Sequence, residues 1–197
     1  MSHELEIEYK NLLTAEEFKR IAAFFDLKRQ HFSLHHNDYL ETETFELKAH
    51  GAMLRIREKG DRKVLTLKQP ATVGLLETHQ PLANAEAKKL LNGGAIPEGD
   101  VASALAQIGF GGVQLVHLGR LSTMRTEIPY DGGTLVLDHS FYLKTDDYEL
   151  EYEVTDAEAG YAIFIKFLED FNIPVRKAPS KSKRFYLALE GTRGAHS

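Results

Sequence analysis

Charged and apolar residues alternate along several stretches of this chain, and this alternation limits most strongly the folds it can adopt. The first stretch alternates Glu4, Glu6, Glu8 and Lys10 with Leu5, Ile7 and Tyr9. A period of two residues is typical of a β-strand with one apolar and one charged face. Three like charges on one strand face repel one another and lower stability. This acidic face therefore calls for an explanation by function.

The same alternation returns in later stretches of the sequence. Their charged positions are Arg55 and Arg57, Lys68, Arg125 with Glu127, Asp138, the triplet Glu149, Glu151 and Glu153, and Lys181 with Lys183. A solvated outer face explains any one such strand. It explains the set less well, because solvated faces favour Thr, Gln and Ser with mixed charge, and because arginine is suited to bidentate binding of oxyanions.

Helical spacing predicts four helices between these strands, over residues 15–25, 84–91, 100–108 and 157–171. Strands are predicted at the N-terminus, as a short hairpin within residues 39–52, as a clear hairpin over 52–68, within 71–83, and over 113–129, 133–142, 147–154 and 180–189. We therefore predict an α+β fold: a closed eight-stranded antiparallel β-barrel with its charged faces lining the lumen and helices packed outside.

Composition excludes several classes of protein. The 197 residues include no Cys and carry a formal net charge of −5, which rules out disulfides and thiolate metal sites and argues against nucleic-acid partners. No apolar stretch approaches the roughly 20 residues that span a bilayer, and no secretion signal is recognisable. We expect a cytoplasmic protein without membrane partners, with one domain over residues 1–190 and a flexible tail at 191–197. A homodimer is left open.

A lumen that carries both signs of charge needs a ligand or internal pairing, because buried charge is otherwise costly. Carboxylates are the usual ligands of hard divalent cations, and lysine and arginine bind polyanions. Enzymes that catalyse phosphoryl transfer combine carboxylates, a metal ion and basic residues. A metal-bound polyphosphate is the ligand that uses both signs at once.

The ordered set of charged residues resembles the CYTH domain, the family of triphosphate tunnel metalloenzymes. EIEYK matches the ExExK signature of the family, and LRIR, LTLK, LVLD, YELEYE and KSK follow in order, so that the resemblance runs over residues 4–189. ExExK alone is a weak signal, whereas the ordered set is specific. The chain has Glu41 where the family often has Asp. The basic strand aligns at Arg120 or Arg125, of which we favour Arg125 because it shares a face with Glu127.

The resemblance implies a tunnel fold and Mg²⁺- or Mn²⁺-dependent hydrolysis of a small-molecule triphosphate, either inorganic or organic. Two alternatives remain open: a class IV-type adenylate cyclase, and a polyphosphate- or nucleotide-binding module without turnover. By this resemblance the catalytic residues are Glu6, Glu8, Lys10 and Arg57. The phosphate-binding residues are Lys10, Arg55, Arg57, Lys68, Arg125, Lys181 and Lys183. The metal ligands are Glu6, Glu8, Asp138, Glu149, Glu151 and Glu153.

Overall fold

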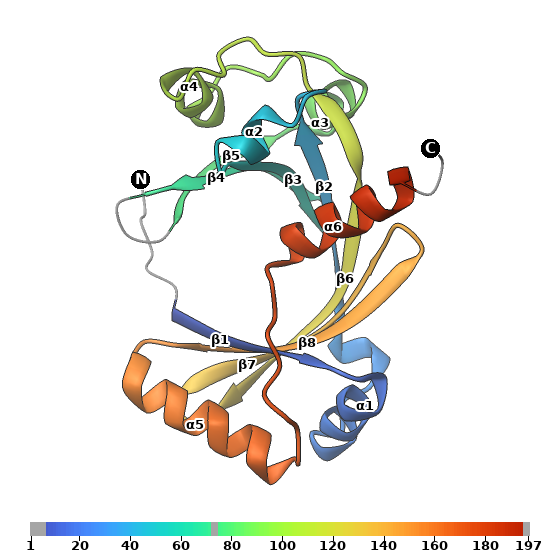
Figure 1. The fold of residues 1–197 in the computed structure, drawn as a ribbon, viewed down its shortest axis with the longest axis vertical. Helices are drawn as coiled ribbons and strands as arrows, with labels where there is room; N and C mark the ends of the chain where they lie inside the picture. The colour runs from blue at the N-terminus through green and yellow to red at the C-terminus, as the bar shows by residue number, and fades with distance from the viewer. Residues whose placement is uncertain (1–6, 72–74, 195–197) are drawn as a thin grey trace. The chain divides into compact units, whose positions relative to one another are not determined.

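The computed structural model describes residues 7–71 and 75–194, so that Glu6 lies outside the described part of the chain. Figure 1 shows the elements in chain order. They are β1 (Ile7–Leu13), α1 (Ala15–Phe24), β2 (Ser33–Glu41), α2 (Glu46–Ala49), β3 (Met53–Lys59), β4 (Arg62–Pro70), β5 (Leu75–Leu82), α3 (Asn84–Leu91), α4 (Asp100–Gln107), β6 (Val116–Tyr130), β7 (Gly133–Tyr142), β8 (Thr145–Val154), α5 (Ala157–Asp170) and α6 (Lys181–Gly194). No helix among these is long and apolar enough to cross a membrane.

The eight strands form one sheet in the order β1-β8-β7-β6-β2-β3-β4-β5. The pairs β1–β8, β2–β3, β3–β4, β4–β5 and β7–β8 are antiparallel. The predicted fold class, an α+β protein on eight antiparallel strands with helices packed against them, is therefore confirmed. Two compact units divide the chain: the first is residues 35–122, and the second is the described chain before and after that segment.

In the first unit, helices α2, α3 and α4 lie together on one side of β3, β4 and β5 (Figure 1). The strands contribute Leu54, Ile56, Leu65 and Leu67 to the apolar core there, all almost completely buried. Because side chains alternate along a strand, the residues between these leucines and isoleucine face away from the helices. The amphipathic strands predicted over residues 52–68 are thus confirmed.

In the second unit, α1 and α5 cover one side of β1, β7 and β8, while α6 lies on the other side (Figure 1). Leu135, Leu137 and Leu150 form the core beneath α1 and α5. A capping box begins α1, since the backbone N–H of Thr14 donates to Glu17 at 2.7 Å and the N–H of Glu17 donates to Thr14 at 3.2 Å. Such caps satisfy backbone donors that the first turn leaves unpaired.

The strand predicted over residues 180–189 is wrong, because these residues belong to α6. A strand would place Phe185, Leu187 and Leu189 on one face. Instead Phe185 and Leu189 are buried while Leu187 is 55% exposed, as the i, i+4 spacing of a helix requires. The helix continues to Gly194, and residues 195–197 of the predicted tail lie outside the described chain.

The short hairpin predicted within residues 39–52 is also wrong, because β2 ends at Glu41 and α2 follows. The side chain of Glu41 is fully buried and accepts hydrogen bonds from the backbone N–H groups of Leu47 at 2.9 Å and Lys48 at 3.0 Å. A carboxylate at a helix N-terminus stabilises that helix. Glu41 therefore holds the start of α2.

Candidate functional site

Three carboxylates meet on the face of the second unit that is turned away from α1 and α5. Asp138 on β7 lies opposite Glu149 on β8 in the strand register, and Glu151 follows two residues later on the same face. Their residues are 0%, 1% and 4% exposed. One oxygen atom from each lies within 4.8 Å of the others, which suits a shared cation. We call Asp138, Glu149 and Glu151 the acidic cluster.

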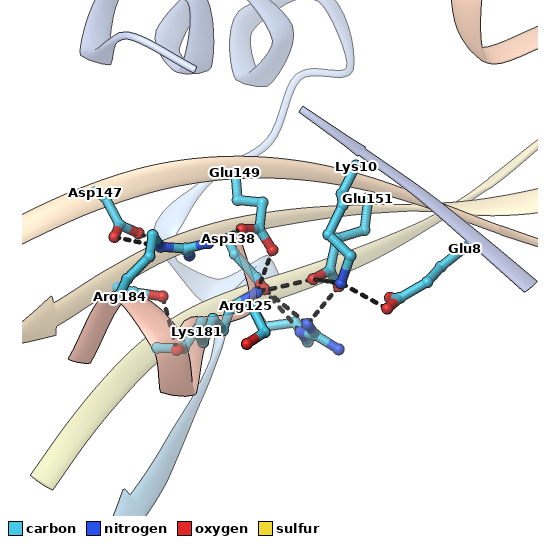
Figure 2. Close-up of polar contacts among 12 residues, drawn as sticks. Glu8, Lys10, Arg125, Asp138, Asp147, Glu149, Glu151, Lys181 and Arg184 are labelled. Carbon is cyan, nitrogen blue, oxygen red and sulfur yellow. Dashed lines mark hydrogen bonds and ion pairs between the residues drawn. The ribbon is translucent and has the colours of Figure 1, made fainter. Parts of the chain in front are cut away.

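Lys181 and Arg125 each contact more than one carboxylate of the acidic cluster. The Lys181 ammonium on α6 lies 2.9 Å from Asp138, 2.6 Å from Glu149 and 2.8 Å from Glu151. The Arg125 guanidinium on β6 donates to both Asp138 oxygens at 2.9 and 2.7 Å and to Glu151 at 2.8 Å. Figure 2 shows these side chains converging. Removing one partner of a buried ion pair costs about 3–5 kcal/mol, so each charge in this group depends on the others.

Burial and mutual repulsion separate the two glutamates electrostatically. Burial, together with the neighbouring Glu151, raises the pKa of Glu149 to about 7. Burial also opposes ionisation of Glu151, but Lys181 and Arg125 outweigh it and hold the pKa of Glu151 below its ordinary value. Burial would lower the pKa of Lys181, yet the three carboxylates raise it above the ordinary lysine value. Lys181 therefore remains a cation.

The N-terminal signature lies beside the acidic cluster. Lys10 on β1 contacts Glu8 at 2.5 Å and Glu151 at 3.9 Å. The register places Glu8 opposite Glu153, so that Glu153 shares the face of the cluster. The structure thus brings Glu8, Lys10 and Glu153 of the predicted site to this face, while Glu6 lies outside the described residues.

The first unit has a polar face of its own, on the side of the sheet away from α2, α3 and α4. Its predicted members are Arg55, Arg57 and Lys68, which share one face according to the register of β3 with β4. Arg57 donates to the amide oxygen of Asn37 at 3.1 Å, and Lys68 forms an ion pair with Glu77. Glu77 was not predicted, because its strand was assigned only loosely within residues 71–83.

Lys183 and Arg184 show how the helical form of α6 changes the predicted site. Lys183 is exposed, because two positions along a helix turn a side chain by about 200° away from Lys181. Arg184 was not predicted, yet it is buried and forms ion pairs with Asp147 at 2.8 Å and with Glu149. The three-residue spacing of Lys181 and Arg184 on a helix would have been the signal.

The structure separates the two arginines between which the basic strand could align. Arg125, the position favoured from the sequence, contacts the acidic cluster. Arg120 instead donates two hydrogen bonds to the carboxylate of buried Asp38 in the first unit, at 3.0 and 2.7 Å. His117 contacts the same Asp38 at 3.0 Å. Arg120 thus satisfies a buried carboxylate of its own unit.

The acidic cluster has the donor chemistry of a divalent-cation site. Mg²⁺ and Mn²⁺ prefer carboxylate oxygens, and a cluster of three carboxylates on two adjacent strands offers several in one place. The Lys181 ammonium already contacts one oxygen of each of these three carboxylates. The residues therefore fit such an ion, with Lys181 and Arg125 beside it to neutralise or bind anionic groups.

Comparisons with known proteins identify the family of this chain. A family model of the CYTH domain matches residues 4–186. The Bacillus subtilis protein named "Putative triphosphatase YjbK" is 45% identical over 186 residues, which are 94% of this chain and 96% of that protein. A solved structure of a "putative adenylate cyclase" from Bacillus halodurans is 43% identical, with a TM-score of 0.85 over 93% of this chain and 98% of the other.

A more distant structure, the HpAC1 protein of Hippeastrum, is 21% identical and has a TM-score of 0.74. It covers 92% of this chain and 95% of its own, which shows a shared fold. The family match over nearly the whole chain includes every strand that carries the candidate site. The chain belongs to the CYTH domain family.

Proposed function

We propose that this protein is a metal-dependent triphosphatase that hydrolyses inorganic triphosphate or an organic triphosphate of the nucleoside or thiamine type. The observation that carries the proposal is the acidic cluster, in which three buried carboxylates bring oxygen atoms within 4.8 Å of one another beside two cations. The B. subtilis relative, 45% identical, is named as a triphosphatase, which supports the same reaction class.

Asp138, Glu149 and Glu151 would hold a divalent cation, Mg²⁺ or Mn²⁺, with Glu6, Glu8 and Glu153 as the further ligands. When bound, such an ion supplies Lewis-acid stabilisation of phosphate charge and lowers the pKa of a coordinated water. The protein's contribution is to hold these carboxylates in fixed positions. Pairing to Arg125 and Lys181 does this, because paired buried charges have little freedom to move.

Lysine and arginine side chains would bind the phosphate chain. Lys10, Arg125 and Lys181 border the acidic cluster, and a triphosphate bound there would give their charges oxyanion partners. Arg55, Arg57 and Lys68 would contribute further phosphate contacts from β3 and β4. Arg57 holds a neutral amide in its 3.1 Å hydrogen bond to Asn37, so a phosphate oxygen is a stronger acceptor for it. Lys183, exposed on α6, would act at most at the edge of this set.

A second candidate is an adenylate cyclase, favoured by the name of the B. halodurans relative at 43% identity. The same carboxylates and cations would then serve attack of the ribose 3′-hydroxyl on the α-phosphorus. Pyrophosphate and a cyclic nucleotide would be the products in place of inorganic phosphate. The residues described above act on the phosphate chain in both reactions, so product analysis separates them.

The test is phosphate release from inorganic triphosphate, ATP and thiamine triphosphate, each with Mg²⁺, Mn²⁺ or EDTA. We expect metal-dependent release that EDTA abolishes and that Asp138→Asn greatly reduces. Release that EDTA leaves unchanged would refute the metal-dependent reaction. Cyclic nucleotide and pyrophosphate from ATP would establish the cyclase, and tight triphosphate binding without any product would establish a binding module.

A further inference from the structure

Arg184 is a buried cation of the second unit. The reaction outlined above assigns it no role. Its side chain is 7% exposed. Its guanidinium donates to both oxygens of Asp147, at 2.8 and 3.1 Å, and also to Glu149 and to the backbone carbonyl of Pro179. Four acceptor contacts on one guanidinium fix both its position and its plane.

The contact with Glu149 completes the coordination of that carboxylate. Lys181 contacts one oxygen of Glu149, Oε1, at 2.6 Å, and Arg184 contacts the other, Oε2. Lys181 and Arg184 are three residues apart in the first turn of α6, so one helix face presents both cations. With both oxygens held, the Glu149 carboxylate cannot rotate about its last torsion without losing a charge-assisted hydrogen bond.

A further pair of residues lies behind Arg184. The Tyr142 hydroxyl, at the end of β7, donates to Asp147 at 2.6 Å. Asp147 in turn accepts both contacts from the Arg184 guanidinium. Tyr142, Asp147, Arg184 and Glu149 therefore form a continuous chain of polar contacts that leads into the acidic cluster, and Figure 2 shows Asp147, Arg184 and Glu149 in this sequence.

We propose that Arg184 is a positioning residue: backed by Asp147 and Tyr142, it sets the orientation of Glu149 in which the acidic cluster binds a divalent cation. This inference rests on the proposed function and adds to it the residue that shapes the cation site from outside. Partners of metal ligands commonly act in this way, and losing one typically weakens metal binding about 10- to 100-fold.

The chain offers a matched control for a purely architectural role. Arg176 lies in the segment between α5 and α6, and it pairs with Glu17 on α1 at 2.6 and 2.9 Å. It ties that segment to the body of the second unit, as Arg184 ties α6. Its hydrogen bonds join it to Asn11, Leu12 and Glu17, none of which belongs to the acidic cluster.

The experiment measures Mn²⁺ binding to the full-length protein without substrate, from the electron paramagnetic resonance signal of free Mn²⁺. The variants are Arg184→Gln, Arg184→Lys, Tyr142→Phe and Arg176→Gln, each with a melting temperature. We expect Arg184→Gln to weaken Mn²⁺ binding about 10-fold or more. Arg184→Lys should lie between it and the wild type, because an ammonium lacks the planar fork with which the guanidinium bonds both oxygens of Asp147. Tyr142→Phe should weaken binding by a smaller factor.

Arg176→Gln should lower the melting temperature and leave Mn²⁺ affinity unchanged. A folded Arg184→Gln protein with wild-type Mn²⁺ affinity would overturn the inference, and so would an equal loss in Arg176→Gln. If Arg184→Gln does not fold, Tyr142→Phe decides, and unchanged affinity in that variant counts against the inference. A wild-type protein that neither binds Mn²⁺ nor releases phosphate would instead refute the proposed function itself, and this inference with it.

Discussion

The two units carry charged strand faces of opposite character. In the second unit the acidic cluster is almost fully buried, and cations of the same unit hold it in place. In the first unit the polar face is basic: the Lys68 side chain is 24% exposed and paired with Glu77, Arg57 donates to Asn37, and Arg55 is buried. Buried charges are fixed by their partners, whereas accessible ones can take up a ligand at low cost. The face of the second unit therefore suits a metal cation, and the face of the first unit suits an anion.

The largest effect should follow from removing one charge of the acidic cluster. Glu151→Gln takes a carboxylate from Lys181 and Arg125 and removes a proposed ligand. We expect metal-dependent phosphate release to fall about 100- to 1000-fold, and the free energy of unfolding to fall by about 3 kcal/mol. Initial rates and urea denaturation measure the two effects. A folded variant that retains half of the wild-type rate would show that the cluster is not the catalytic metal site.

A change in the first unit should act on substrate and leave the metal alone. Arg57→Ala removes a proposed phosphate contact on β3 without touching the acidic cluster, so we expect kcat/KM for triphosphate to fall about 100-fold. Mn²⁺ binding should stay at the wild-type value. Arg62→Ala, which removes an exposed arginine from the next strand, serves as the control and should be silent. Normal turnover by Arg57→Ala would rule out Arg57 as a phosphate-binding residue.

Asp38 tests whether the buried carboxylate of the first unit is structural. Burial opposes its charge, but hydrogen bonds from His117 and Arg120 outweigh burial and hold its pKa below the ordinary 3.8. A depressed pKa contributes stability that is present above 3.8 and is lost as pH falls through the folded-state pKa.

Asp38→Asn should therefore lower the free energy of unfolding by about 1–2 kcal/mol near neutral pH, and it should flatten the loss of stability on acidification. Urea denaturation as a function of pH measures both. The kcat at neutral pH should stay close to wild type. A large loss of turnover in a folded Asp38→Asn protein would place this carboxylate in the reaction and remove the contrast with the acidic cluster.

The smallest predicted effect is a change in KM for triphosphate, and the direction of that change is informative. Glu77 pairs with Lys68. The pKa of Glu77 is lowered, because hydrogen bonding and attraction to Lys68 outweigh burial. The Glu77 carboxylate is therefore an anion that competes with phosphate for Lys68. Glu77→Gln should lower KM for triphosphate about threefold, the size expected from releasing a partly exposed ion pair. Steady-state kinetics at constant ionic strength measure this. An increase in KM would mean that Glu77 itself helps to orient the substrate.

Period-two alternation was enough to predict the strand faces, but it does not report burial. The sequence shows the same pattern for Arg55 and Arg57 as for Glu149 and Glu151, although the structure buries the glutamates far more uniformly beneath cations. Burial depends on what covers a face, and that is a tertiary property.

The wrong assignment of one segment explains both the misplaced Lys183 and the missed Arg184. KSKRFYLAL satisfies both a period of two and a period of 3.6, and choosing the strand placed Lys183 beside Lys181 and hid Arg184. Glu41 was uncertain for a related reason, because its role as a cap for α2 becomes visible only once a helix is expected there. Short segments with mixed periodicity are settled by packing.

Paramagnetic broadening of backbone amide signals by Mn²⁺ would locate the metal most directly. In a protein of 22.2 kDa, amide spectra can be followed while Mn²⁺ is added in less than stoichiometric amounts. We predict that signals near Asp138, Glu149 and Glu151 broaden first, and that triphosphate does not move the centre of broadening. Broadening centred on another carboxylate, such as Asp38 or Asp146, or no selective broadening at all, would contradict the acidic cluster as the metal site.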